Sequence, residues 1–238
     1  MAITTRAIDY GTDDKFEGML ALDESATGPR PAVLVAHAWA GRSDFEVDKA
    51  KDIAGLGYAG FALDLYGKGV LGQTKEENQA LMTPLLEDRA KLQSQLAEAV
   101  AVVKAQPEVD ETKVVAIGYC FGGLCVLDLA RMGADVLGVA SFHGLFNAPG
   151  NLDGKTIDAK VLALHGWDDP MATPDQAVAF AAEMNERKAD WQLHGYGGTV
   201  HAFTNPHAND PEFGTVYSKT ADTRSWVTLR AFLDELFA

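Results

Sequence analysis

The feature that most constrains this chain is a regular alternation of short apolar runs with longer amphipathic segments. The apolar runs are nearly continuous, which is typical of strands covered on both faces in a mainly parallel sheet. The sequence predicts such strands at 32–36, 60–65, 113–118, 136–142, 160–165 and, more weakly, 190–195. Strands that alternate with helices in this way predict a doubly wound α/β domain.

Helical spacing of apolar residues fills the intervals between these strands. The predicted helices cover 45–56, 75–105, 121–132, 174–187 and 216–236. Ser43 and Asp44 suit the N-cap of the first helix, and Thr173 followed by Pro174 suits the start of the fourth. Pro84 should break or begin the long second helix, because proline removes a backbone donor.

The first thirty residues have a different pattern. Segments 4–10 and 16–22 flank a turn-prone stretch and predict an antiparallel hairpin at the sheet edge. No internal repeat or linker-like composition divides the 238 residues, so we expect residues 1–238 to form one domain.

Charge and cysteine content narrow the classes of partner. The 34 acidic and 20 basic residues give a formal charge of −14. Such a surface repels nucleic-acid phosphates and anionic lipid, so neither is an expected partner. The alternative explanation of the charge is that it keeps the protein in solution. No apolar run approaches the length of about 18 residues that a membrane span needs, and the N-terminus lacks a signal-like apolar core. Two cysteines form no disulfide framework, so a reducing, cytoplasmic location is expected.

The sharpest local signal is the strand-like run 114–117 followed by Gly118-Tyr119-Cys120-Phe121-Gly122. A buried strand that enters Gly-x-Cys-x-Gly before a helix is a nucleophile-elbow pattern with cysteine in place of serine. The N-terminal end of the helix favours thiolate over thiol, and the Phe121 N–H should point at a developing oxyanion. The alternative is structural, since a lone cysteine is often a small buried hydrophobe. That inert role is expected of Cys125.

Two later loops supply an acid and a base. Asp169 follows a predicted strand, three residues after Gly166, whereas Asp168 suits a solvated turn that caps the next helix. His201 lies in a glycine-rich loop after the last predicted strand. The order of nucleophile, acid and histidine, each after a strand, predicts a Cys120-Asp169-His201 triad in an α/β-hydrolase fold.

The remaining histidines do not suggest a metal centre. His37, His143 and His165 each end a predicted strand, near the rim of the expected site. No metal-ligand spacing and no dinucleotide-binding glycine motif occurs, so the sequence predicts neither a metal nor an organic cofactor.

Over nearly its whole length the sequence resembles the dienelactone hydrolase family. The resemblance rests on segments 57–69, 118–123, 165–170 and 200–206. It implies a carboxylic ester or lactone hydrolase of the carboxymethylenebutenolidase type. Cys120 would be the nucleophile, His201 the base and Asp169 the residue that orients it, with a thioester intermediate. The amides of Phe121 and Trp39 would form the oxyanion hole.

The sequence departs from the family pattern at two positions. Family members carry a glutamate that helps to activate the thiol where Ala38 stands here. Cys120 would then either pair directly with His201 as a thiolate or be less reactive. Members that cleave dienelactone place a carboxylate-binding arginine where Asn205 stands. Arg89 is the nearest basic candidate, and the alternative for it is an ordinary surface arginine.

The substrate is expected to be a small ester or lactone. Trp39, Tyr66 and Phe142 are candidates for apolar walls of its pocket, and the alternative for each is a core residue. A thioesterase or general carboxylesterase would share the triad, and a non-catalytic or redox-sensing protein would keep the fold without hydrolysis. The sequence predicts no nucleic-acid or membrane partner, and a monomer or small homo-oligomer.

Overall fold

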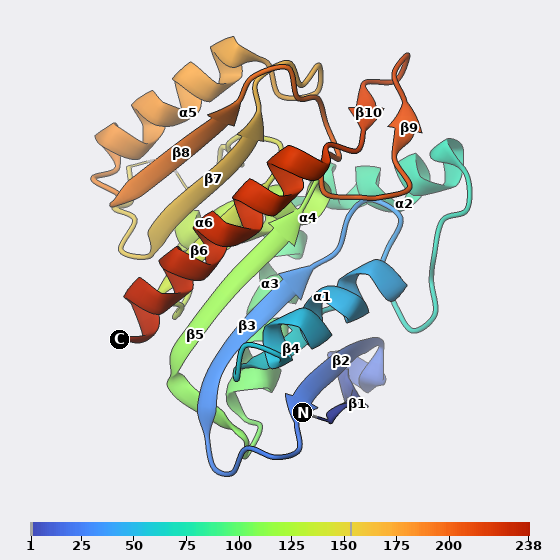
Figure 1. Cartoon of the computed structure of the whole chain (residues 1–238), viewed down its shortest axis with the longest axis vertical. Coiled ribbons are helices and arrows are strands. Elements are labelled where there is room, and N and C mark those ends of the chain that lie inside the picture. The colour runs from blue at the N-terminus through green and yellow to red at the C-terminus, as the bar shows by residue number, and fades with distance from the viewer. Residues whose placement is uncertain (1, 153) are drawn as a thin grey trace.

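An eight-stranded sheet forms the centre of the protein in the computed structural model, which describes residues 2–152 and 154–238 (Figure 1). The strand order is β1-β2-β4-β3-β5-β6-β7-β8. Strands β3 to β8 run parallel, while β2 pairs antiparallel with both β1 and β4. The strands span Ile3–Tyr10 (β1), Phe16–Asp23 (β2), Arg30–Ala36 (β3), Ala59–Ala62 (β4), Val109–Tyr119 (β5), Gly138–Phe142 (β6), Lys160–Gly166 (β7) and Trp191–Tyr196 (β8).

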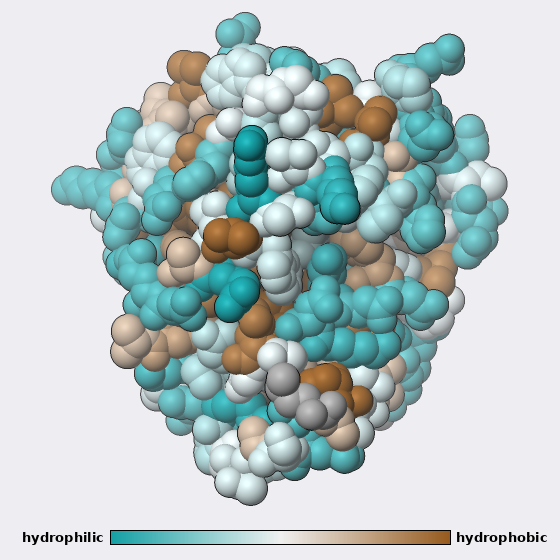
Figure 2. Space-filling model, in the orientation of Figure 1, coloured by the Kyte–Doolittle hydropathy of each residue, from teal (hydrophilic) through white to brown (hydrophobic). Residues whose placement is uncertain are grey.

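Helices cover both faces of this sheet, as the nearly continuous hydrophobicity of its parallel strands requires. The helices span Asp44–Ala54 (α1), Lys75–Glu87 (α2), Arg89–Lys104 (α3), Phe121–Met132 (α4), Pro174–Glu186 (α5) and Lys219–Phe237 (α6). Residues of α1 and α6 pack into one apolar core, and residues of α2 to α5 pack into the other. Apolar side chains are therefore buried between the layers, and Figure 2 shows hydrophilic side chains spread over much of one face.

The N-terminal hairpin and the parallel strands confirm the predicted fold class. β1 pairs with β2 from Ile3 opposite Asp23 to Tyr10 opposite Phe16. The N-caps are also confirmed: Ser43 forms a capping box with Glu46, and Thr173 does so with Gln176.

Two details of the predicted helices need correction. The segment 75–105 is broken at Asp88 rather than at Pro84, which lies inside α2. Asp88 has non-helical torsions and its carboxylate accepts a hydrogen bond from the Lys91 N–H, so it caps α3. The last helix begins at Lys219 rather than at 216, because residues before it form a small hairpin of β9 (Asn209–Asp210) and β10 (Thr215–Val216).

Candidate active site

Cys120 occupies the sharp turn between β5 and α4. Its φ of 57° lies in the left-handed region that non-glycine residues rarely adopt. A Cβ on Gly118 would lie 2.0 Å from the Gly122 carbonyl oxygen, and a Cβ on Gly122 would lie 2.2 Å from the Ala36 carbonyl oxygen. The two glycines therefore let the strand, the turn and the helix approach one another, as expected for a nucleophile elbow.

The two cysteines have different surroundings. Cys120 is half-buried, precedes the first turn of α4 and lines a cavity. Cys125 is fully buried within α4, and burial raises the pKa of its thiol well above the ordinary value. Only Cys120 is therefore placed to react with a ligand in the cavity.

Asp169 and His201 come together at the carboxyl ends of β7 and β8. The His201 Nδ1 donates to Asp169 Oδ2 at 2.7 Å, and both side chains are buried. The other carboxylate oxygen, Oδ1, accepts from the N–H groups of Met171 and Ala172 at 2.8 and 3.3 Å. Asp168 is exposed, and the N-cap of the following helix is Thr173 instead.

The β9–β10 hairpin holds His201 at the wall of the cavity. The His201 N–H donates to the Gly214 carbonyl, and the Val216 N–H donates to the His201 carbonyl, so the β9–β10 hairpin fixes its backbone. Nε2 has no hydrogen-bond partner among the described residues, and both His201 and Cys120 line the cavity. Burial disfavours the imidazolium, but the negative charges of Cys120 and Asp169 outweigh this effect and raise the pKa of His201 to about 10. The raised pKa favours the protonated imidazole of His201 at neutral pH.

A second histidine, His143, supports the backbone of the elbow. The Cys120 N–H is shared between the Phe142 carbonyl at 3.0 Å and His143 Nδ1 at 3.2 Å, and His143 Nε2 donates to Thr204 Oγ1 at 2.8 Å. Burial, and then the positive charge of His201, lower the pKa of His143 well below the ordinary value. His143 is therefore a neutral imidazole that fixes the nucleophile's backbone and leaves the positive charge to His201.

The loop after β3 carries the second predicted oxyanion donor, the Trp39 N–H. Glu46, buried in α1, accepts from the Ala38 N–H at 3.1 Å. His37 Nδ1 donates to the Ala38 carbonyl at 2.7 Å, and the Tyr66 hydroxyl donates to the Trp39 carbonyl at 3.1 Å. Among the described residues, the amides of Trp39 and Phe121 donate to no acceptor outside regular secondary structure. Trp39 lines the cavity, whereas Phe121 is fully buried and does not, so the predicted oxyanion hole stays a prediction.

The cavity above Cys120 has a volume of about 690 Å³. Most of its surface is apolar, and its large apolar side chains are Trp39, Phe45, Met82, Leu145, Met171 and Phe213. This composition is typical of sites for small organic ligands.

Three residues predicted for the substrate pocket lie elsewhere. Phe142 is fully buried, stacked on Tyr119 in the core beneath the sheet edge. Tyr66 packs against His37 and holds the Trp39 carbonyl, so it supports the loop without lining the cavity. Of the predicted walls, only Trp39 lines the cavity.

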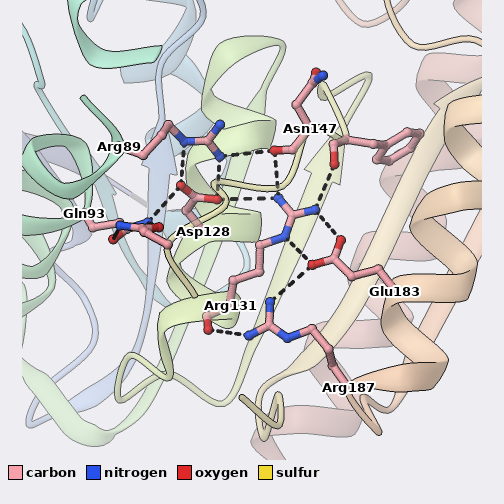
Figure 3. Close-up of polar contacts among 9 residues, drawn as sticks. Arg89, Gln93, Asp128, Arg131, Asn147, Glu183 and Arg187 are labelled. Carbon is pink, nitrogen blue, oxygen red and sulfur yellow. Dashed lines mark hydrogen bonds and ion pairs between the residues drawn. The ribbon is translucent and has the colours of Figure 1, made fainter. Parts of the chain in front are cut away.

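Arg89, the third, also requires correction, because it belongs to a buried ionic network (Figure 3). Its guanidinium donates to both carboxylate oxygens of Asp128, at 2.6 and 2.8 Å. Asp128 also pairs with Arg131, which is fully buried and bonded to Glu183 at 2.7 Å. Arg89 and Arg131 both donate to the Asn147 carbonyl. The network therefore joins α3, α4 and α5 to the loop after β6, and Arg89 does not line the cavity.

Within the described residues, no group of three or more histidine, cysteine or acidic side chains is arranged to hold a metal ion. The helices in the described ranges also include none that is long and apolar enough to cross a membrane. The predictions on cofactors, nucleic acid, location and oligomeric state stay predictions.

Sequence reasoning missed Glu46, Thr204 and the β9–β10 hairpin. Glu46 could have been found, since Ser43 followed three residues later by glutamate is the capping-box pattern. Thr204 and the hairpin, which consists of two-residue strands, leave no periodic signal.

The parallel core, its antiparallel edge and the elbow after β5 define an α/β-hydrolase fold. A model of the dienelactone hydrolase family matches residues 16–237, and the chain belongs to this family. It is a dienelactone hydrolase-like hydrolase.

Individual relatives agree with this assignment. The chain is 27% identical over 232 residues to the carboxymethylenebutenolidase of Pseudomonas sp. (strain P51), covering 94% of this chain and 93% of the relative. The crystal structure of P91, a dienelactone hydrolase-like promiscuous phosphotriesterase from metagenomic libraries, is 36% identical with a TM-score of 0.93 over 100% of both chains. An esterase from Thermogutta terrifontis shares the fold at 15% identity, with a TM-score of 0.72 over 98% of this chain and 92% of that chain.

Proposed function

We propose that the protein hydrolyses a carboxylic ester or lactone through a thioester on Cys120, with His201 and Asp169 completing the triad. The observation that carries this proposal is the geometry of His201. Its Nδ1 is fixed by Asp169 at 2.7 Å, which leaves its buried Nε2 for the thiol of Cys120, and the two residues line the same cavity. The raised pKa of His201, to about 10, supports direct activation of the thiol without the family glutamate that Ala38 replaces.

Acylation begins when the Cys120 thiolate attacks the substrate carbonyl carbon. The carbonyl electron pair moves to oxygen, which accepts hydrogen bonds from the amides of Phe121 and Trp39. The electron pair then returns, the C–O bond breaks, and the alcohol leaves with the proton of His201 Nε2.

Deacylation uses the same groups in reverse. Water attacks the thioester carbonyl while His201 Nε2 accepts its proton. The C–S bond breaks, the carboxylic acid leaves, and Cys120 returns as a thiolate beside the imidazolium. Asp169 keeps the imidazole in the tautomer that both steps need.

Phosphotriester hydrolysis is a second candidate, favoured by the full-length similarity to P91. The same sulfur would attack phosphorus and displace an aryl oxide. A thioesterase would use the same steps on a sulfur leaving group, and a redox-sensing protein would use Cys120 without turnover.

The test is hydrolysis of 4-nitrophenyl acetate by the wild type, Cys120→Ala and the matched control Cys125→Ala. We expect Cys120→Ala to lose turnover and Cys125→Ala to keep it, because Cys125 is buried away from the cavity. Acid-quenched wild type should carry an acetyl group on the peptide that contains Cys120.

Equal activity of the wild type and Cys120→Ala, or no activity in either, would overturn the proposal. Paraoxon and an acyl thioester, assayed with the same three proteins, separate the phosphotriesterase and thioesterase alternatives. Reversible oxidation of Cys120 without hydrolysis of any of these substrates would support the redox-sensing alternative.

A further inference from the structure

The charged side chains at the mouth of the cavity are arranged so that little net charge faces a ligand. Among the described residues that line the cavity, Lys75 is the only lysine or arginine. Its Nζ pairs with Asp210 Oδ2 at 2.7 Å. The other acidic lining residue, Glu46, is buried and accepts hydrogen bonds from the Ala38 and Ser43 N–H groups. A substrate carboxylate would therefore meet no uncompensated cation.

The Lys75–Asp210 pair also completes an aromatic wall. The Lys75 Nζ lies 4.1 Å from the centroid of the Phe213 ring. Phe213 stacks on Trp39, with ring centroids 5.7 Å apart and planes inclined by 18°. Lysine over an aromatic face is a favourable contact, so it holds the ring in place. Three segments that are distant in sequence, the loop after β3, the start of α2 and the β9–β10 hairpin, meet here, and Figure 1 shows the hairpin beside α2.

We infer that this wall selects uncharged aromatic esters: the aryl group packs against Trp39 and Phe213, and Asp210 cancels the charge of Lys75. The inference rests on the proposed function and names its substrate class. Apolar surface and an aromatic edge favour a flat neutral ring. Desolvation of an anion in the same cavity is opposed, because the two cations that line it, Lys75 and His201, are already paired with Asp210 and Asp169.

The experiment uses two esters that differ by one charge, 4-acetoxyphenylacetate and its methyl ester, with release of the phenol as the readout. The methylene group separates the charge from the ring, so the two phenols are similar leaving groups. For the wild type we expect kcat/KM to be at least about tenfold higher for the neutral ester.

Asp210→Asn should leave the charge of Lys75 unpaired. It should therefore raise the ratio of kcat/KM for the anionic ester to kcat/KM for the neutral ester by about threefold, the size of one solvent-exposed charge interaction. High salt should reduce this gain. The double variant Asp210→Asn with Lys75→Met should return this ratio of kcat/KM values, anionic over neutral ester, to its wild-type value. Phe213→Leu should raise KM for the neutral aryl ester with little change in kcat, because the ring binds substrate and transition state alike.

Asp135→Asn is the matched control, since it removes the partner of Lys104 at the amino end of β6, away from the cavity. It should leave the ratio unchanged. A wild type that prefers the anionic ester, or an Asp210→Asn variant with an unaltered ratio, would overturn the inference while Cys120-dependent hydrolysis persists. Loss of that dependence would instead count against the proposed function.

Discussion

Replacing Asp169 with asparagine tests the proposed triad at its most constrained point. Asp169 makes two kinds of contact: Oδ1 accepts from the Met171 and Ala172 N–H groups, and Oδ2 accepts from His201. The amide oxygen of the substituted side chain can keep the contacts to the loop. Its NH₂ group must then face His201 Nδ1 and donate to it, which places the imidazole proton on Nε2.

This change acts on both the tautomer and the charge of His201. The hydrogen bond and the negative charge of Asp169 both raise the pKa of His201, so their loss lowers that pKa and weakens the thiolate–imidazolium pair. The same substitution in serine hydrolases costs about 10⁴-fold in kcat. We therefore expect a loss of about 10³- to 10⁴-fold, or about 4 to 5.5 kcal/mol of transition-state stabilisation.

The assay measures kcat for an activated aryl ester together with the rate at which iodoacetamide alkylates Cys120 at pH 6. Both rates should fall in Asp169→Asn. The matched control is Asp168→Asn, because Asp168 is the exposed neighbour and does not contact His201. A kcat within threefold of the wild type in Asp169→Asn, or equal losses in both variants, would refute the reasoning.

Two further predictions concern stability. Asp128→Ala leaves the buried guanidinium of Arg131 without one partner, so we expect it to lower the free energy of unfolding, measured by urea titration, by about 3 kcal/mol or more. The surface control Asp135→Asn should lower it by about 0.5 kcal/mol or less. Equal losses in the two variants would contradict this prediction. Burial lowers the pKa of His37, His143 and His165, so below about pH 6.5 the unfolded chain binds protons that these native imidazoles do not. The raised pKa of His201 opposes this effect only above about pH 6.5, because below that pH His201 is protonated in both the native and the unfolded chain. The free energy of unfolding should therefore fall as the pH falls from about 6.5 to about 5.5, by up to about 1.4 kcal/mol per pH unit for each of the three buried histidines. An unchanged or higher stability at the lower pH would contradict this prediction.

The sequence by itself determined the fold class and the placement of the proposed triad. Nearly continuous apolar runs can be buried only in a sheet covered on both faces, which gives a parallel α/β core. Gly118 and Gly122 around Cys120 are dictated locally, because a side chain at either position would collide with backbone. Asp169 and His201 follow strands, and the carboxyl ends of neighbouring parallel strands meet at one edge of the sheet.

The tertiary structure decided the surroundings of that site. Arg89 was predicted near the substrate, but a buried carboxylate, Asp128, binds its guanidinium instead. The aromatic wall joins Trp39, Lys75 and Phe213, which come from three distant segments. Such contacts depend on how loops pack across the sheet edge. They have no local periodicity and no backbone constraint that would mark them in the sequence.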